Sequence, residues 1–252
     1  MIRTETVFVE GKGQRVEGIL CLPEKEKPTY PTVVVAHGFG GNYRFYTGSV
    51  AKALAEKGFA AYAFNFRNPD TRSMLHTTVL TEAETLNIVL DGIRPMPFAD
   101  PERLYLLGES QGGFVAAYTA AHRTDVRRLV LFYPAFVLQD DAGKRNPGWD
   151  KPGYVFPETE VIGNNTVSGI YSEAALSFDI YETIRAYRNP VLLVHGTADP
   201  VVPLSYSERA AGVYENAELR IIEGAGHGFY WGEPFALSVD LTAEFLQGEE
   251  GV

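Results

Sequence analysis

The chain has 252 residues, of which 45% are hydrophobic and 21% are charged. This composition is typical of a folded globular protein and excludes a disordered chain, and the length suits one large domain over residues 1–252. The formal net charge is -10. Because nucleic acids and anionic membranes attract basic surfaces, this charge argues against both as partners.

Cysteine content and terminal sequence bear on the cellular compartment. The single cysteine, Cys21, excludes an intrachain disulfide. The first residues lack the apolar stretch of a signal peptide, and no apolar run approaches the roughly 18 residues of a membrane span. We therefore expect a cytoplasmic protein.

Eight segments carry the pattern of β-strands. The first two, around Val7 and Val9 and over residues 16–22, alternate apolar and polar side chains. The other six are short, continuous apolar runs, as expected of strands buried on both faces of a parallel sheet. They cover residues 32–36, 60–64, 104–107, 129–132, 191–194 and 219–222.

Helical patterns lie between these apolar runs. One surrounds Val50 and Leu54 and stops at Gly58, and others cover residues 80–93, 114–121, 206–214 and 235–245. Alternating strands and helices with short links predict an α/β fold with a mostly parallel, doubly wound sheet of eight strands. The two amino-terminal strands are expected to add an antiparallel edge.

One long connection, residues 135–176, interrupts this alternation after the sixth strand; we refer to it as the insertion. It is far longer than the usual link of about four to six residues and has no clear hydrophobic period. Its aromatic content, including Trp149 and Tyr171, favours a folded cap over a disordered linker.

The run 108–113 (GESQGG) matches G-x-S-x-G, the pattern of a nucleophilic serine. It follows the strand 104–107 and precedes the helix that includes Phe114, which is the strand–turn–helix setting this motif requires. The glycines relieve crowding in a sharp turn that strains the serine backbone. Ser110 is therefore the predicted nucleophile.

A serine hydroxyl needs a base, and the chain has five histidines. His37 and His195 end strands, where structural roles are expected, and the patterns place His76 and His122 at the surface. His227 lies in a glycine-rich loop after the last strand, residues 223–229 (EGAGHGF). Because such a loop can bring an imidazole to the carboxyl ends of the strands, His227 is the predicted base.

Two further components complete the predicted site. Asp199 follows the strand 191–194, and the chain order Ser110, Asp199, His227 is the order expected for a doubly wound α/β fold with this nucleophile turn. An oxyanion needs N–H donors, for which we expect the backbone amides of Gln111, after the nucleophile, and Phe39, after the strand 32–36. No residue spacing suggests a metal site.

Taken together, four motifs resemble the α/β-hydrolase superfamily over nearly the whole chain: residues 37–40 (HGFG), 108–112 (GESQG), 196–202 (GTADPVV) and 224–227 (GAGH). Within the superfamily the chain is most similar to bacterial cinnamoyl (feruloyl) esterases. These share a His-Gly-Phe oxyanion loop, a Ser-Gln-Gly-Gly turn and a compact insertion after the sixth strand. The resemblance implies an α/β-hydrolase fold and esterase chemistry without a cofactor.

The chain departs from these esterases at two places. Glu109 stands where the family usually has histidine, and the glycine- and proline-rich stretch 142–152 does not reproduce the family's phenol-binding residues. Only Asp141 and Tyr171 fall where those esterases contact the aromatic hydroxyl. The resemblance thus implies Asp141 and Tyr171 as substrate-binding residues.

These observations predict a carboxylic ester hydrolase whose partner is a small-molecule ester of the hydroxycinnamoyl type. A serine peptidase acting on short peptides is one alternative, although the chain lacks the large extra domain of such peptidases. A non-catalytic binding protein of the same fold is another, although the predicted triad is complete. The oligomeric state is open, with a homodimer as one option.

Overall fold

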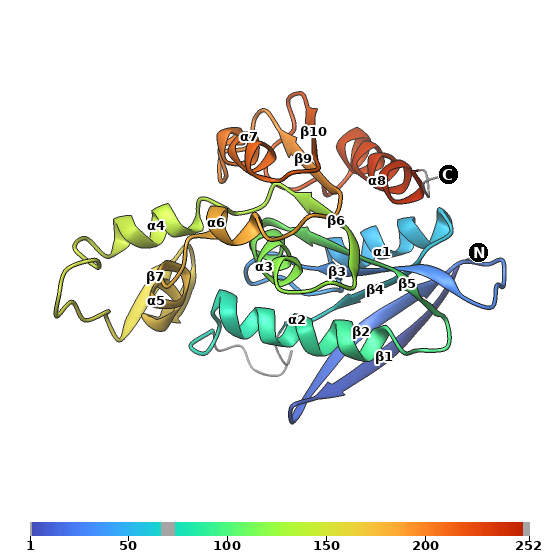
Figure 1. The fold of residues 1–252 in the computed structure, drawn as a ribbon, viewed down its shortest axis with the longest axis horizontal. Helices are drawn as coiled ribbons and strands as arrows, with labels where there is room; N and C mark the ends of the chain where they lie inside the picture. The colour runs from blue at the N-terminus through green and yellow to red at the C-terminus, as the bar shows by residue number, and fades with distance from the viewer. Residues whose placement is uncertain (1, 67–73, 249–252) are drawn as a thin grey trace.

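A computed structural model, which describes residues 2–66 and 74–248, contains one eight-stranded sheet in the order β1-β2-β4-β3-β5-β6-β9-β10 (Figure 1). The strands are β1 (Arg3–Gly11), β2 (Gln14–Leu22), β3 (Tyr30–Ala36), β4 (Ala60–Phe64), β5 (Ala99–Glu109), β6 (Val126–Phe132), β9 (Val191–Gly196) and β10 (Ala217–Ile222). Strand β2 is antiparallel to both of its neighbours, and the pairs from β4 to β10 are parallel. The prediction of a mostly parallel α/β sheet with an antiparallel edge is confirmed.

Helices cover both faces of the sheet. One face packs against α1 (Tyr46–Glu56) and α8 (Gly232–Gln247), and the other against α2 (Val79–Ile93), α3 (Ser110–Ala121), α6 (Ile180–Ile184) and α7 (Leu204–Val213). Strand β3 supplies both cores, with Val33 and Val35 on the first face and Val34 and Ala36 on the second. Since successive side chains of a strand point to opposite faces, coverage on both faces explains its continuous apolar sequence.

The insertion folds into short elements outside the main sheet. It contains α4 (Leu138–Arg145), the antiparallel hairpin of β7 (Thr159–Ile162) and β8 (Asn165–Ser168), and α5 (Ile170–Leu176). In Figure 1, α4, β7 and α5 form a lobe at the left, and α6 leads back toward β9. Elements of four to eight residues are too short to show a period, which explains why the sequence indicated none.

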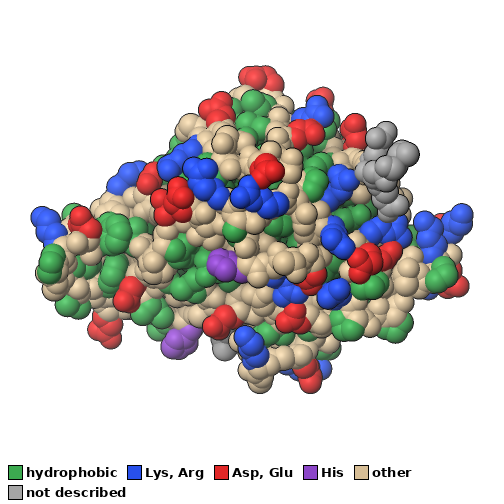
Figure 2. Space-filling model, viewed as in Figure 1, with side chains coloured by type: hydrophobic (Ala, Val, Ile, Leu, Met, Phe, Trp, Pro, Cys, Tyr) green, Lys and Arg blue, Asp and Glu red, His purple; other side chains and the backbone are tan. Residues whose placement is uncertain are grey.

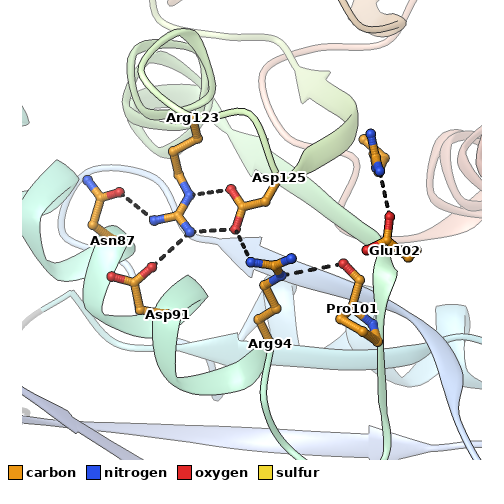
Figure 3. Close-up of polar contacts among 8 residues, drawn as sticks. Asn87, Asp91, Arg94, Pro101, Glu102, Arg123 and Asp125 are labelled. Carbon is orange, nitrogen blue, oxygen red and sulfur yellow. Dashed lines mark hydrogen bonds and ion pairs between the residues drawn. The ribbon is translucent and has the colours of Figure 1, made fainter.

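An ion-pair network joins helices to strands at the amino ends of β5 and β6 (Figure 3). The Arg123 guanidinium lies 2.8 Å from the Asp91 carboxylate of α2 and 2.6 Å from that of Asp125. It also donates a 2.9 Å hydrogen bond to the side-chain oxygen of Asn87. In the view of Figure 2, acidic and basic side chains intersperse over this side of the molecule. The network thus stabilises the sheet at the amino ends of its strands. The motif residues lie at the other end, beside the carboxyl ends.

Candidate active site

Ser110 lies at the turn between β5 and α3, in a strained backbone conformation. Its φ of 50° is in the left-handed region, which is uncommon for a residue with a side chain, and backbone strain of this kind is concentrated at active sites. A Cβ on Gly108 would lie 2.3 Å from the Gly112 carbonyl oxygen, and one on Gly112 would lie 2.3 Å from the carbonyl oxygen of His37. Both glycines of the motif are therefore required sterically.

His227 reaches Ser110 from the loop between β10 and α8. That loop turns through Gly224 and Gly228, with φ values of 71° and 95°. The His227 Nε2 lies 3.0 Å from the Ser110 Oγ, and its Nδ1 lies 2.7 Å from the Asp199 Oδ2. With the Nδ1 proton donated to the carboxylate, Nε2 is free to accept the serine proton. The structure thus brings the three predicted residues into one hydrogen-bonded series.

Asp199 is held as an anion although its side chain is fully buried. Burial alone would raise its pKa, but hydrogen bonds from the imidazoles of His195 and His227 outweigh burial and hold the pKa of Asp199 well below its ordinary value. Backbone N–H groups of Val201 and Val202 add donors to Oδ1 at 2.8 and 2.9 Å. Asp199 can therefore orient His227 and stabilise its protonated form.

His195 is a site residue that the sequence motifs did not reveal. Its Nε2 lies 3.3 Å from the Asp199 Oδ2 and 2.9 Å from the Val202 carbonyl oxygen, and its Nδ1 lies 2.7 Å from the Ser207 Oγ. His195 and Ser207 are completely buried. Asp199 thus contacts two histidines, one directed toward the nucleophile and one toward the interior. The four-residue spacing between His195 and Asp199 is the sequence signal that could have found it.

Glu109 is a second buried acid of the site. Burial raises its pKa, although hydrogen bonds from Tyr133 and Gly38 and the nearby His227 act in the opposite direction. The Tyr133 hydroxyl donates to one carboxyl oxygen at 2.7 Å, and the Gly38 N–H donates to the other at 3.2 Å. Glu109 therefore connects the nucleophile turn to the loop that follows β3. The sequence marked it only as a departure from the resembled family.

The two predicted oxyanion donors lie on elements that meet at Ser110. Gln111 is the second residue of α3, and the N–H groups of a first helical turn have no acceptor within the helix. Phe39 follows Gly38, whose added Cβ would lie 3.1 Å from the Ser110 Cβ and 3.6 Å from its Oγ. The β3 loop is thus in contact with Ser110, the predicted nucleophile. The donor roles of the two amides stay predictions.

A pocket of about 720 Å³ opens onto Ser110 and His227. Its polar lining includes Glu109 and Arg44. Its aromatic lining consists of Phe39, Phe45, Tyr46, Tyr133, Tyr230 and Trp231. Among the described residues, the lining comes from α1, from the turn between β5 and α3, and from the loops after β3, β6, β9 and β10, and none of it from the insertion.

The two predicted phenol contacts, Asp141 and Tyr171, are outside this pocket. Asp141 lies on α4, half exposed, with a carboxylate oxygen 3.2 Å from the Lys144 Nζ. Tyr171 lies on α5, 3% exposed, and its hydroxyl donates to the Gln111 side-chain oxygen. The structure therefore brings Tyr171, but not Asp141, against the nucleophile turn. Their contact with a substrate stays a prediction.

Across residues 2–66 and 74–248, no three or more His, Cys, Asp or Glu side chains group so as to hold a metal ion. In the same part of the chain, no helix combines the length and the apolar character needed to cross a membrane. The two acids of the site, Asp199 and Glu109, bond instead to imidazole, hydroxyl and amide groups.

Comparisons with known proteins agree with this fold. A sequence model described as "Alpha/beta hydrolase family" matches residues 33–241. The "Putative carbamate hydrolase RutD" of Caulobacter sp. (strain K31) is 26% identical, with 86% of this chain and 91% of that protein covered. The "Uncharacterized protein YfhR" of Escherichia coli O157:H7 is also 26% identical, over 80% of this chain but only 65% of its own length.

Among solved structures, Est1E from Butyrivibrio proteoclasticus superimposes with a TM-score of 0.83 at 22% identity, covering 96% of this chain and 97% of Est1E. A second structure of that protein, titled "Ferulic Acid bound to Est1E", superimposes with a TM-score of 0.80, again at 22% identity, over 95% of this chain and 97% of that one. At such identities the likeness establishes a shared fold.

Proposed function

The chain belongs to the alpha/beta hydrolase family, and from that premise we propose that it is a serine esterase that hydrolyses carboxylic esters through an acyl-enzyme. The observation that carries the proposal is the unbroken series from the Ser110 Oγ through both nitrogens of His227 to the Asp199 carboxylate. Such a series activates a hydroxyl that is otherwise a weak nucleophile.

Acylation begins when the Ser110 Oγ attacks the ester carbonyl and His227 Nε2 takes its proton. The carbonyl oxygen becomes an oxyanion, which the amides of Phe39 and Gln111 stabilise. His227 then returns the proton to the alcohol oxygen as the ester C–O bond breaks. Asp199 stays ionised throughout and stabilises the transient imidazolium.

Deacylation repeats these steps with water. His227 takes a proton from water as the water oxygen attacks the acyl carbonyl, and the same two amides hold the second oxyanion. When the bond to the Ser110 Oγ breaks, His227 returns the proton to the serine and the carboxylic acid leaves. The cycle restores the starting protonation of the triad.

The proposed acyl group is aromatic, of the hydroxycinnamoyl type. Support comes from the aromatic lining of the pocket beside Ser110, which suits a flat ring. The ferulic acid complex of the structurally similar Est1E agrees with this choice of acyl group. Asp141 and Tyr171 are absent from the lining, so the proposal depends on the aromatic walls and not on a phenol contact.

Two assays test the proposal. A fluorophosphonate probe should label wild type on Ser110 and leave Ser110→Ala unlabelled. Methyl ferulate should be hydrolysed with a higher kcat/KM than methyl acetate, and both ahead of an aminoacyl amide. Absence of label and of ester turnover would support a binding protein instead, and preference for the amide would support a peptidase. A higher kcat/KM on methyl acetate than on methyl ferulate would contradict only the proposed aromatic acyl group and leave the esterase proposal intact.

A further inference from the structure

We infer that Tyr171, supplied by the insertion, is a positioning residue for the oxyanion hole, which it holds by contacting Gln111 and Phe39 together. The inference rests on the proposed esterase function. It assigns the insertion a part in stabilising the transition state through a residue that does not touch the substrate. Four observations support it in turn.

First, the Tyr171 side chain is bonded to the residue that follows the nucleophile. Its hydroxyl donates to the Gln111 Oε1 at 2.5 Å, and the Gln111 Nε2 donates to the Glu82 Oε2 at 2.7 Å. All three residues are buried, with exposures of 2% to 4%. The Gln111 side chain is therefore held from both ends, by α5 of the insertion and by α2, and its backbone amide is held with it.

Second, the same ring contacts the other predicted donor residue. The rings of Tyr171 and Phe39 meet edge to face, with centroids 5.6 Å apart and an interplanar angle of 63°. Such contacts prefer a defined geometry and stabilise the pair beyond the burial of the two rings. Tyr171 thus links the β3 loop to the start of α3, the two segments that carry the predicted oxyanion amides.

Third, the insertion holds Tyr171 in place through its neighbour in α5. The Ser172 hydroxyl is fully buried and donates to the Glu160 Oε2 at 2.6 Å, while the Arg145 guanidinium donates to the Ser172 Oγ at 3.0 Å. Arg145 and Glu160 also form an ion pair at 3.3 Å. A buried network across α4, β7 and α5 therefore determines where the Tyr171 ring stands.

Fourth, the Tyr171 hydroxyl is already occupied, and its residue does not line the pocket beside Ser110. Tyr171 therefore affects the substrate only indirectly, by orienting the backbone amides that hold the oxyanion. Misplacing oxyanion donors reduces stabilisation that exists only in the transition state, so it lowers kcat and leaves KM largely unchanged.

The first experiment compares Tyr171→Phe with Tyr187→Phe. The first variant removes the hydroxyl and keeps the ring; the second removes another buried tyrosine hydroxyl, which donates to the Val126 carbonyl oxygen at the amino end of β6, away from the site. Substrates are methyl ferulate and methyl cinnamate, which differ in the phenol, together with phenyl acetate. We expect Tyr171→Phe to lower kcat about tenfold on all three esters, with KM within about twofold. Tyr187→Phe should match wild type.

The second measurement is the inhibition constant of phenylboronic acid, which forms a tetrahedral adduct on the serine. We expect Tyr171→Phe to weaken this inhibitor by the same factor as kcat, since a transition-state mimic needs the same donors. Adding Tyr171→Phe to Gln111→Met, which already removes the acceptor, should cause little further loss. Thermal unfolding of each variant identifies any loss of activity that is caused by a less stable fold.

Different outcomes overturn different proposals. If wild type hydrolyses no ester and takes no fluorophosphonate, the esterase proposal fails and this inference with it. If wild type is active and Tyr171→Phe loses turnover only on methyl ferulate, Tyr171 contacts the phenol and the positioning role is wrong. Unchanged kcat and boronate inhibition in Tyr171→Phe, or equal losses in Tyr187→Phe, would also overturn it.

Discussion

Two buried carboxyl groups lie near His227: Glu109 at the end of β5 and Asp199 after β9. Their surroundings shift their pKa values in opposite directions. The pKa of Glu109 is raised, mainly by burial, whereas hydrogen bonds hold that of Asp199 low despite burial. Glu109 receives one hydroxyl and one amide donor, while Asp199 receives two imidazoles and two amides. Asp199 has more hydrogen-bond donors than Glu109, and these donors outweigh burial at Asp199 but not at Glu109.

The largest expected effect separates the two acids by function. Asp199→Asn should lower kcat/KM by about 10³–10⁴-fold, because the amide no longer supports the His227 tautomer and imidazolium that catalysis needs. Glu109→Gln should lower it by less than about tenfold, since the carboxyl takes no part in proton transfer. Steady-state kinetics on an aryl ester measures both, with Asp240→Asn, a surface acid paired with Lys57, as the control. Equal losses of kcat/KM in Asp199→Asn and Glu109→Gln would contradict the different roles assigned to the two acids.

A smaller effect tests the donor on the inner side of Asp199. His195→Leu removes the 3.3 Å imidazole contact, and leaving a buried charge short of a donor costs about 1–3 kcal/mol. We therefore expect kcat/KM to fall about tenfold or more. His195→Gln, whose amide can replace the Nε2 donor, should retain more activity. Similar losses in both variants would indicate that the shape of His195, and not its donor, matters.

The smallest effect, on stability, has opposite signs for the two acids. A raised pKa means that the folded state disfavours ionised Glu109, so wild type loses stability as pH rises above the unfolded value of about 4.3. The Tm of Glu109→Gln should therefore gain on wild type between pH 4 and pH 7. In a chain of this size, a change of about 1 kcal/mol in the free energy of unfolding corresponds to a Tm shift of about 2–4 °C.

For Asp199 the sign reverses. Its lowered pKa contributes stability that is fully present above the unfolded value of about 3.9 and is lost as pH falls toward the folded value. Asp199→Asn should thus have a Tm below wild type by a constant amount from pH 7 to about pH 5, with the gap closing only in stronger acid. Differential scanning calorimetry at a series of pH values distinguishes the two patterns; parallel curves for both variants would contradict them.

The main features of the fold were predictable because they have local signals. Continuous β-branched runs such as 32–36 indicate strands covered on both faces, and G-x-S-x-G after a strand indicates the nucleophile turn. The Ser110, Asp199, His227 order required no spatial information, and the structure brings these three side chains together.

What escaped prediction depends on packing between distant segments. The contact of Tyr171 with Gln111 joins residues 60 positions apart, and that of Tyr133 with Glu109 joins residues 24 positions apart. No pattern within a short window records such pairs. His195 is a different case, because it lies only four positions before Asp199 and that short spacing was an available signal.

Under the proposed function, the spacing of Ser110, Asp199 and His227 along the chain has a consequence for synthesis on the ribosome. His227 lies 117 positions after Ser110 but only 28 after Asp199, so the acid and the base emerge late and together. They join the nucleophile only once β9 has added beside β6 and β10 beside β9. A nascent chain thus carries its serine without a base until the last two strands dock. Recovery of hydrolysis during refolding therefore reports the completion of the sheet, separately from recovery of secondary structure.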